Sequence, residues 1–583
     1  MEHGANPLKN GGVQFRAWAP DVSSLAVQLS QRPPLAMHRA GEDFELSVSD
    51  AQPGDTYSFL FDDGRLRPDP VSRSQPYGVH GPSQVVDPDS FVWSDQDWKG
   101  IALSDYILYE LHVGTFTAEG TFASAISKLG HLQDLGITAI ELMPVCEFPG
   151  TRNWGYDQVD LYAPHSAYGG ADGLKAMVDA CHQAGIAVVL DVIYNHVGPE
   201  GNYLAEFGPY FTDQYRTPWG RAMNFDGPGS DGVRRFVIEN ALYWLTEYHI
   251  DALRLDAIHG IFDFSARHIL SELRDRFHEQ AARSGREAWV IAESDLNDVR
   301  VLNSCASGGY RLDAQWLDDF HHSVHTYLTG ANRAYLAGFG ELRHIQKAIT
   351  DGFVYDGCYS SFRKRHFGSS SRALPGHRFV AFIQNHDQIA NTSQGSRLSQ
   401  LVSLDQYKVA VALLLCSPCL PLLFMGEEFA AVNPFLYFTS HGDAGLARAV
   451  SEGRRNEYAE LMVSGEFIDP QGLEAFERSK ISWNLAADDR HAGILDLYRE
   501  LIGLRKRWPC LHNGRKDLTR VDVDPHAKWL RMERADPSGS QATLLCNFSD
   551  TRMEPDLDQA TLALSTSPRP GAPLSACLFL ANP

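Results

Sequence analysis

The sequence predicts an α/β protein in which a (β/α)8 TIM barrel is flanked by an N-terminal β-sandwich and a C-terminal β domain. Eight apolar, strand-like runs alternate with helical patterns through the middle of the chain. Short alternating runs between turns precede this region, and strand patterns without helices follow it. The chain has 583 residues, a length that suits about three domains rather than one.

Residues 1–98 are predicted to form the β-sandwich, of the carbohydrate-binding or early-set type. The stretches GVQFRAWAP (12–20) and SLAVQLS (24–30) alternate apolar and polar residues, which is the period of a half-buried strand. A third stretch, DTYSFLFDDGRLRPDP (55–70), contains an Asp-Gly pair, a common turn signal between strands.

Residues 99–508 are predicted to form the barrel, with insertions. The eight strand-like runs lie at 106–116, 137–145, 186–194, 250–258, 288–294, 312–320, 378–385 and 419–428. Between the third and fourth runs, residues 232–249 place apolar side chains at 233, 237, 241, 244 and 248, which is helical spacing. Such strand–helix units are the repeating element of a closed parallel barrel. Residues 509–583 lose the helical pattern, and KWLRMER (528–534) and ATLLCNF (542–548) indicate strands of the C-terminal β domain.

Composition narrows the possible partners. The formal net charge of −22 argues against nucleic acid or an anionic membrane, because both favour clustered Lys and Arg. No apolar run approaches the ~18 residues of a membrane span, and the N-terminus lacks a signal-peptide pattern. We therefore expect a cytoplasmic protein that binds a neutral substrate.

The nine cysteines are scattered and odd in number, which favours a reducing compartment over a disulfide framework. Cys416 and Cys419 form a C-x-x-C pair, but they lie in the apolar run LLLCSPCLPLLF, so we interpret them as core residues. A Cys–His zinc motif, a carboxylate-rich calcium loop and a phosphate-binding glycine loop are all missing from the sequence. We predict neither a metal nor a cofactor.

Four of the apolar runs end in polar residues. In a (β/α)8 barrel the catalytic groups lie at the carboxyl ends of the strands, so these residues are expected to meet at one mouth. The candidates are Asp191, Asn195 and His196 at the end of the third run, Arg254, Asp256 and His259 at the end of the fourth, Glu293 and Asp295 at the end of the fifth, and Asn385, His386 and Asp387 at the end of the seventh.

Two of these carboxylates indicate a chemistry. Arg254 and Asp256 are two residues apart, so they share a strand face, and the arginine would keep the aspartate ionised as a nucleophile needs. Glu293 follows the apolar residues WVIA, and partial burial would raise its pKa toward an acid role. Paired carboxylates of this kind perform glycoside hydrolysis, and Asp387 would anchor sugar hydroxyls. A single Asp at a strand end is more often a helix cap, and each histidine taken alone is as often structural as functional.

The four clusters resemble the four short motifs of the α-amylase superfamily, which DVIYNH, LRLDAIH, IAES and QNHD match in order. The resemblance implies retaining chemistry, with Asp256 as nucleophile, Glu293 as general acid/base and Asp387 as transition-state stabiliser. It also implies that four further residues line the sugar site, namely Arg254, His196, His386 and Tyr156 of NWGYD.

Longer stretches are similar to the maltooligosyltrehalose trehalohydrolase group of that superfamily. They are LRLDAIHGI, AESDLNDVR, QNHDQIAN, LLFMGEEFAAVNPFLYFTSH, FERSKISW and RPDPVSRSQPYGVHGPSQVVD. This resemblance implies hydrolysis of the α-1,4 bond that joins a maltooligosaccharide to a terminal trehalose. The implied partners are maltooligosyl trehalose and maltooligosaccharides, and we expect a monomer that works with a maltooligosyl trehalose synthase.

Three further residues are candidates for sugar contacts, and the first two of them are placed to face the trehalose side. His259 follows the proposed nucleophile by three residues, and Asp295 follows the proposed acid by two. Asp295 could equally be a surface helix cap. Trp219 lies in a loop rich in Gly and Pro, where it could stack on a sugar or anchor the loop.

Two other functions stay open at this stage. A glycogen branching or debranching enzyme would share the barrel and the N-terminal sandwich. A non-catalytic glucan-binding barrel would be expected to lack the nucleophile or the acid, and both are present here.

Overall fold

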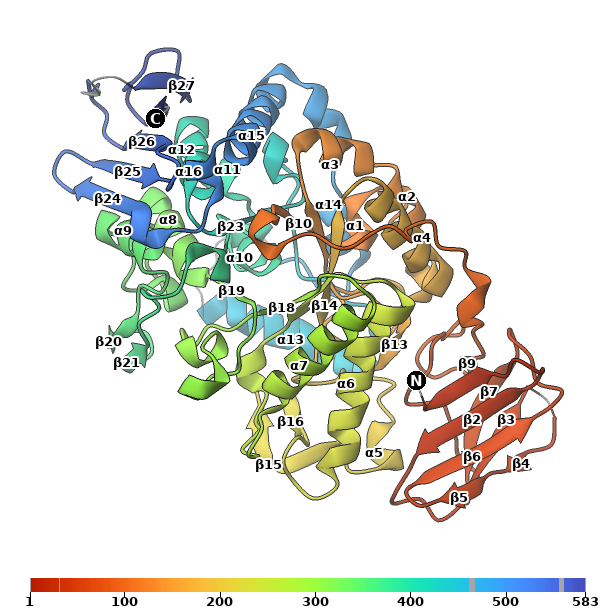
Figure 1. Cartoon of the computed structure of the whole chain (residues 1–583). Coiled ribbons are helices and arrows are strands. Elements are labelled where there is room, and N and C mark those ends of the chain that lie inside the picture. Colours follow the sequence, from red (N-terminus) through yellow and green to blue (C-terminus); the bar gives the residue numbers. More distant parts are fainter. Residues whose placement is uncertain (1, 31, 461–466, 555–559, 582–583) are drawn as a thin grey trace.

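The computed structural model describes residues 2–30, 32–460, 467–554 and 560–581, and its centre is a closed barrel of eight parallel strands (Figure 1). The barrel strands are β10 (Leu108–Leu111), β11 (Ala139–Leu142), β14 (Ala187–Val192), β17 (Ala252–Leu255), β18 (Trp289–Ala292), β19 (Ala314–Trp316), β22 (Phe379–Ala381) and β23 (Leu420–Phe424). Each of the eight predicted runs contains one of these strands, so the predicted fold class is confirmed.

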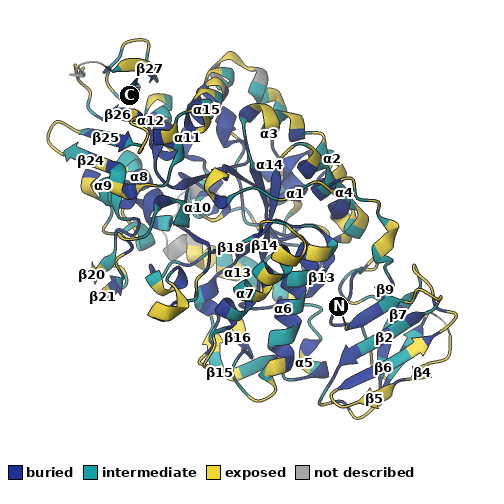
Figure 2. Cartoon of the chain, in the orientation of Figure 1, coloured by how far each residue is buried: buried dark blue, intermediate teal, exposed yellow. Residues whose placement is uncertain are grey.

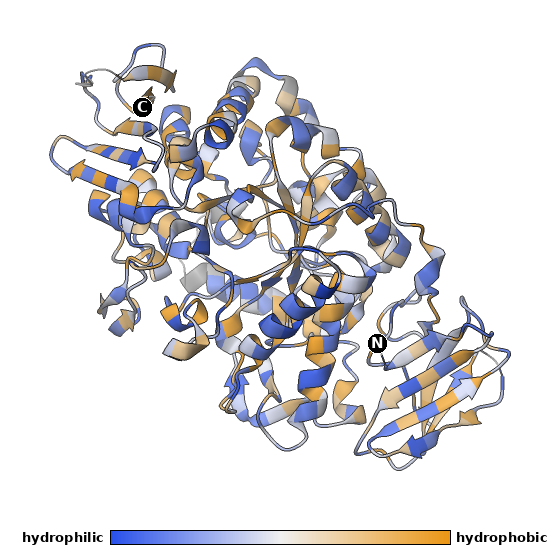
Figure 3. Ribbon diagram, in the orientation of Figure 1, coloured by the Kyte–Doolittle hydropathy of each residue, from blue (hydrophilic) through white to orange (hydrophobic). Residues whose placement is uncertain are grey.

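Helices surround the barrel. The longer ones are α4 (Gly170–Gln183), α6 (Ser230–Glu247), α7 (Ile269–Arg283), α8 (Asp318–Thr329), α9 (Leu342–Thr350), α12 (Leu404–Cys416), α13 (Ala444–Glu460) and α15 (Asp489–Arg507). The helix predicted at 232–249 corresponds to α6. The barrel strands are buried (Figure 2) and largely hydrophobic (Figure 3), as expected for parallel strands covered on both faces.

Two antiparallel sheets precede the barrel and one follows it. The N-terminal strands are β1 (Gly4–Pro7), β2 (Val13–Trp18), β3 (Leu25–Leu29), β4 (Leu35–Ala36), β5 (His38–Ala40), β6 (Asp43–Val48), β7 (Thr56–Phe61), β8 (Leu66–Arg67) and β9 (Ser83–Gln84). One N-terminal sheet has the order β1-β2-β6-β5 and the other β4-β3-β7-β8, with β9 paired to β7. The C-terminal strands are β24 (Thr519–Asp524), β25 (Trp529–Ala535), β26 (Gln541–Asn547), β27 (Thr561–Ser565) and β28 (Ser575–Ala581). They form one sheet in the order β24-β25-β26-β28-β27, and β25 and β26 lie where strands were predicted. The exact domain limits at 98 and 508 stay predictions.

Cys416 and Cys419 are core residues, as the sequence indicated. Both are buried, and burial raises the pKa of Cys416 to about 12 and that of Cys419 to about 11. Thiols held so far from ionisation are poor nucleophiles and poor metal ligands. Among the helices of the described ranges, none has both the length and the apolar character that crossing a membrane requires.

The N-terminal sheets meet the barrel layer at Trp18 and α6. The Trp18 ring packs edge-on against Tyr210, with 5.1 Å between ring centres. Gly232 lies in the first turn of α6, and a Cβ atom added there would lie 2.0 Å from Cζ2 of Trp18. A glycine at 232 therefore allows the indole and the helix backbone to be in close contact.

We expect Gly232→Ala to destabilise the protein, by about 1–3 kcal/mol of unfolding free energy, because the added methyl overlaps a buried indole. The matched control is Gly503→Ala in α15, where a Cβ has no neighbour within 4 Å. Helix propensity alone should then make the control more stable, by up to about 1 kcal/mol. Urea unfolding of both variants is the measurement, and equal effects of the two alanines would contradict the packing argument.

Candidate active site

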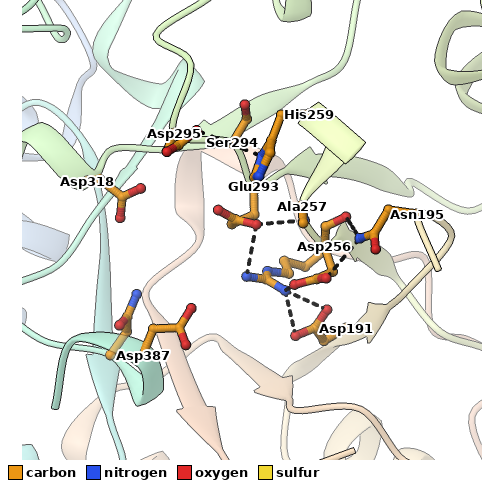
Figure 4. Close-up of polar contacts among 12 residues, drawn as sticks. Asp191, Asn195, Asp256, Ala257, His259, Glu293, Ser294, Asp295, Asp318 and Asp387 are labelled. Atoms are coloured by element: carbon orange, nitrogen blue, oxygen red, sulfur yellow. Dashed lines mark hydrogen bonds and ion pairs between the residues drawn. The ribbon is translucent and has the colours of Figure 1, made fainter. Parts of the chain in front are cut away.

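Arg254 forms ion pairs with Asp191, Asp256 and Glu293. These three carboxyl groups lie together at the carboxyl ends of β14, β17 and β18 (Figure 4). The Arg254 side chain is fully buried, and its Nη1 donates to both carboxylate oxygens of Asp191, each at 2.9 Å. The same nitrogen donates to Oδ1 of Asp256 at 2.7 Å. Burial raises the pKa of Asp191 to about 7 even though Arg254 acts to lower it. One guanidinium thus compensates the charge of two neighbouring carboxylates.

Asp256 is fixed by hydrogen bonds on both carboxylate oxygens. Arg254 holds Oδ1, and the Asn195 side-chain amide donates to Oδ2 at 2.9 Å and to the Asp256 carbonyl at 2.7 Å. The two-residue spacing predicted this common face, because alternate side chains of a strand point the same way. The residue is buried but still reaches an open cavity, described below.

Glu293 follows β18 and lies beside Asp256. Its Oε2 lies 3.7 Å from Nη2 of Arg254 and accepts a hydrogen bond from the Ala257 backbone N–H at 2.6 Å. Burial raises the pKa of Glu293 against the effect of Arg254, and the charge of Asp256 raises it further. The carboxyl therefore favours its protonated form over a wider pH range than an exposed glutamate does.

Ala257 has a left-handed backbone, with φ of 39° and ψ of 50°. This conformation is costly for a residue with a Cβ, and such strain clusters at functional sites. Here it turns the chain directly after Asp256 and aims the Ala257 N–H at Glu293. The strained turn therefore couples the positions of the two carboxylates.

A cavity of about 440 Å³ opens next to Asp256 and Asp387. Its aromatic walls include Trp154, Tyr156 and Tyr437. Asp387 lies in the first turn of α10 (His386–Ala390), and its side chain is about 52% exposed. Flat apolar walls with a few carboxylates suit a sugar ring, which has apolar faces and a polar edge.

Tyr156 and His386 lie together at one side of this cavity. The Tyr156 hydroxyl donates to Oδ2 of Asp191 at 2.8 Å, and its ring is stacked on the His386 ring with 5.4 Å between centres. His386 Nδ1 is hydrogen-bonded to Glu110. Burial acts to lower the pKa of His386, but the carboxylates of Glu110 and Asp387 raise it to about 9. His386 is therefore a buried cation at neutral pH.

His196 and Trp219 form a second aromatic pair. Their rings are stacked, with 5.1 Å between centres and 14° between planes. Trp219 is 44% exposed and lines the cavity together with His196. Of the two readings that the sequence left open, this arrangement favours an indole available to a ligand over a buried loop anchor.

His259 and Asp295 lie beyond Glu293, on the side away from Asp191 (Figure 4). Nδ1 of His259 is 3.9 Å from Oδ1 of Asp295, whose Oδ2 accepts a hydrogen bond from Arg363 at 2.7 Å. Asp295 is not the cap of the following 3-10 helix η5 (Val299–Val301), because Asp298 has that position. The ten residues that were predicted to be catalytic or to contact sugar thus all lie at the carboxyl end of the barrel strands.

Sequence reasoning missed several residues of the cluster. The Trp316 ring centre lies 4.3 Å from the Arg254 guanidinium, and Glu110 pairs with His386. Trp316 and Glu110 both lie within predicted strand runs. The search for polar residues at strand ends could therefore have found Glu110. Arg363 comes from the hairpin of β20 (Asp356–Ser360) and β21 (Arg365–Gly368), an insertion for which no local pattern signals a site.

Comparison with known proteins defines the class of this enzyme. Residues 85–219 match the family model of the alpha amylase catalytic domain. The crystal structure of a Salmonella typhimurium protein assigned as an alpha amylase is 40% identical, covers 100% of both chains and gives a TM-score of 0.93. A pullulanase of Paenibacillus barengoltzii, at 19% identity and a TM-score of 0.75 over 100% of this chain and 96% of its own, shares the fold. The protein is an α-amylase-type glycoside hydrolase.

Curated relatives define the family within that class. The chain is 46% identical to the malto-oligosyltrehalose trehalohydrolase of Saccharolobus solfataricus over 90% of each chain. It is 42% identical to the enzyme of the same name from Deinococcus radiodurans, over 91% of this chain and 87% of that one. The chain belongs to the malto-oligosyltrehalose trehalohydrolase family.

The raised pKa of His386 predicts a pH-dependent contribution to stability. Because the folded pKa is about 9 against an ordinary value of 6.5, the contribution is complete below pH 6.5 and is lost as the pH rises toward 9. It amounts to about 3 kcal/mol.

The test replaces the ion pair by two amides, as Glu110→Gln/His386→Gln. We expect the unfolding free energy of the wild type, measured in urea between pH 6 and 9.5, to fall relative to that of the double variant. Parallel pH profiles would show that His386 is not a buried cation.

Proposed function

We propose that this protein hydrolyses the α-1,4 bond that joins a maltooligosaccharide to a terminal trehalose, and so releases trehalose. The observation that carries the proposal is the contact of one buried guanidinium, that of Arg254, with both Asp256 and Glu293. This contact places the carboxyl group of Asp256 beside that of Glu293, whose pKa is raised by burial, next to an aromatic cavity. The family to which the chain belongs supplies the substrate class.

The proposed reaction is a double displacement. Asp256 attacks the anomeric carbon, and its C–O bond forms as the glycosidic C–O bond breaks. Glu293 gives its proton to the leaving oxygen of the trehalose unit, then removes a proton from the water that hydrolyses the glycosyl-enzyme. Two inversions at the same carbon retain its configuration. The two carboxyl groups lie side by side. This position supports the double displacement over an inverting mechanism, which needs space for a water molecule between the two groups.

The substrate contacts follow from the positions of the remaining residues. We assign Asp387, Tyr156, His196 and His386 to the sugar on the maltooligosaccharide side, because they line or border the cavity next to Asp256. His259 and Asp295 are assigned to the trehalose unit, whereas Trp219, which lines the cavity beside His196, is assigned to stacking on a sugar ring. Asp387 would stabilise the developing positive charge of the sugar ring.

The other two functions are less favoured. The 1,4-alpha-glucan branching enzyme of Pseudoalteromonas atlantica is only 26% identical over 90% of this chain. A purely glucan-binding barrel would have no need for a strained turn that couples two carboxyl groups. A cytoplasmic location, a monomeric state and cooperation with a maltooligosyl trehalose synthase stay predictions.

The proposed specificity is tested by product analysis on maltotriosyl trehalose and maltopentaose in parallel. We expect trehalose and maltotriose from the first substrate and slow cleavage of the second. Equal cleavage of both would replace the proposal by a general amylase activity. New or lost α-1,6 branches in glycogen, detected by an iodine-spectrum shift, would support the branching or debranching alternative.

The two catalytic roles predict different variant phenotypes. Asp256→Asn should lower kcat by at least about 10⁴-fold at every pH, because a covalent step loses its nucleophile. Glu293→Gln should lose activity on maltotriosyl trehalose but keep most of it on a maltotrioside with a nitrophenyl leaving group, which needs no proton. Nitrophenol release and trehalose release are the two measurements, and equal losses on both substrates would contradict the acid role.

The same role predicts a pH effect. The raised pKa of Glu293 keeps the acid protonated to a higher pH than usual, so kcat/KM should fall only as the pH rises through that raised value. The wild type should show this alkaline decline for trehalose release from maltotriosyl trehalose and lack it for nitrophenol release, which needs no proton. An equal alkaline limb on both substrates would assign the titration to another group.

A further inference from the structure

Asp318 is a carboxyl group in the site to which nothing above assigns a role. It follows β19 directly and is the first residue of α8. Figure 4 shows its side chain pointing toward the space bordered by Glu293, Asp295 and Asp387. Gln388 donates to Oδ1 of Asp318 at 3.5 Å, a long hydrogen bond. Gln388 in turn accepts a hydrogen bond from the Tyr335 hydroxyl at 3.1 Å.

The surroundings of Asp318 leave its charge poorly compensated. Burial raises its pKa well above the usual range, and the carboxyl groups of Glu293, Asp295 and Asp387 raise it further. Arg363, which lies at the neighbouring Asp295, is ion-paired with that residue. Carboxyl groups that share an open space without a cation need hydrogen-bond donors, and sugar hydroxyls are such donors.

Asp318 lies on the side of the leaving group. Glu293, as the proton donor, must face the glycosidic oxygen. The sugars of the leaving group are attached to that oxygen, so they lie on the far side of Glu293 as seen from Asp256. The cavity next to Asp256 is lined by Tyr156 and Asp387 but not by Asp318. Asp318 is instead near Asp295, which Figure 4 shows beyond Glu293.

We propose that Asp318 is a specificity-determining residue whose carboxyl group accepts hydrogen bonds from hydroxyls of the leaving trehalose, on the glucose unit next to the scissile bond. The inference rests on the proposed function for the identity of that leaving group. A simpler role is available, because a carboxylate in the first turn favours a helix N-terminus. A sugar contact predicts that the effect of a substitution depends on the leaving group. A purely structural role predicts that the effect is the same for every leaving group.

The test compares two substrates with the same maltotriosyl donor, maltotriosyl trehalose and 4-nitrophenyl α-maltotrioside. Asp318→Asn keeps the shape of the side chain and an oxygen for Gln388. We expect kcat/KM for trehalose release to fall about 10- to 100-fold, because an amide cannot reproduce all the hydrogen bonds that sugar hydroxyls make with a carboxyl group. Nitrophenol release should stay within about threefold of wild type, because a nitrophenyl group offers no hydroxyls.

Asp157→Asn is the matched control. Asp157 is a carboxylate that lines the cavity next to Asp256, so any effect of its amide should be the same for both substrates. Equal losses on the two substrates in Asp318→Asn would overturn the proposal in favour of a structural role. Unchanged kinetics on both would overturn it as well. A shared shift of the alkaline limb of kcat/KM would show that Asp318 acts through Glu293 rather than on the sugar.

Binding of trehalose separates this inference from the proposed function. In an Asp256→Asn background, Asp318→Asn should weaken trehalose binding at least about tenfold by calorimetry. If the wild type fails to cleave maltotriosyl trehalose but trehalose binding still depends on Asp318, the proposed function fails and the contact stands. Trehalose binding that is unaffected by the substitution overturns the contact.

Discussion

The candidate site depends on the buried guanidinium of Arg254. Three carboxyl groups from three strand ends approach it, and each would otherwise be a charge in a poorly solvated space. Buried ion pairs of this kind add little net stability, because desolvation offsets the attraction. Their value here is geometric, since Nη1 fixes the directions of Asp191 and Asp256 by hydrogen bonds, while Nη2 lies 3.7 Å from Glu293.

The barrel provides what that interaction requires. Neighbouring parallel strands pair Asp191 with Arg254 and Arg254 with Ile291 in register, so the polar side chains emerge at one level. The Trp316 ring lies against the guanidinium. The strained backbone of Ala257 then directs an N–H to Glu293. Closure of the sheet, rather than any local motif, brings these groups together.

The sequence predicted the barrel well because buried parallel strands give long apolar runs, and every one of the eight was visible. It predicted Arg254, Asp256 and Glu293 as neighbours for the same reason, since strand ends converge by topology. It could not resolve whether Asp295 caps a helix, because its partner Arg363 comes from a hairpin nearly seventy positions later in the chain. The exposure of Trp219 likewise depends on how its loop returns to His196.

The two sides of the site differ in chemistry, and the difference fits the two halves of the proposed substrate. The cavity next to Asp256 has aromatic walls, which suit a helical glucan whose sugar faces repeat. Beyond Glu293 the groups are mainly carboxyls and a histidine. Trehalose and maltose differ in how their two glucose rings are linked, so an enzyme can distinguish them by the position of the second ring and of its hydroxyls. A fixed set of acceptors discriminates such an arrangement strongly, because a wrong sugar leaves buried polar groups without partners. An apolar pocket discriminates it weakly, since both disaccharides present similar apolar faces. The acidic character of this side is therefore what selective release of trehalose would require.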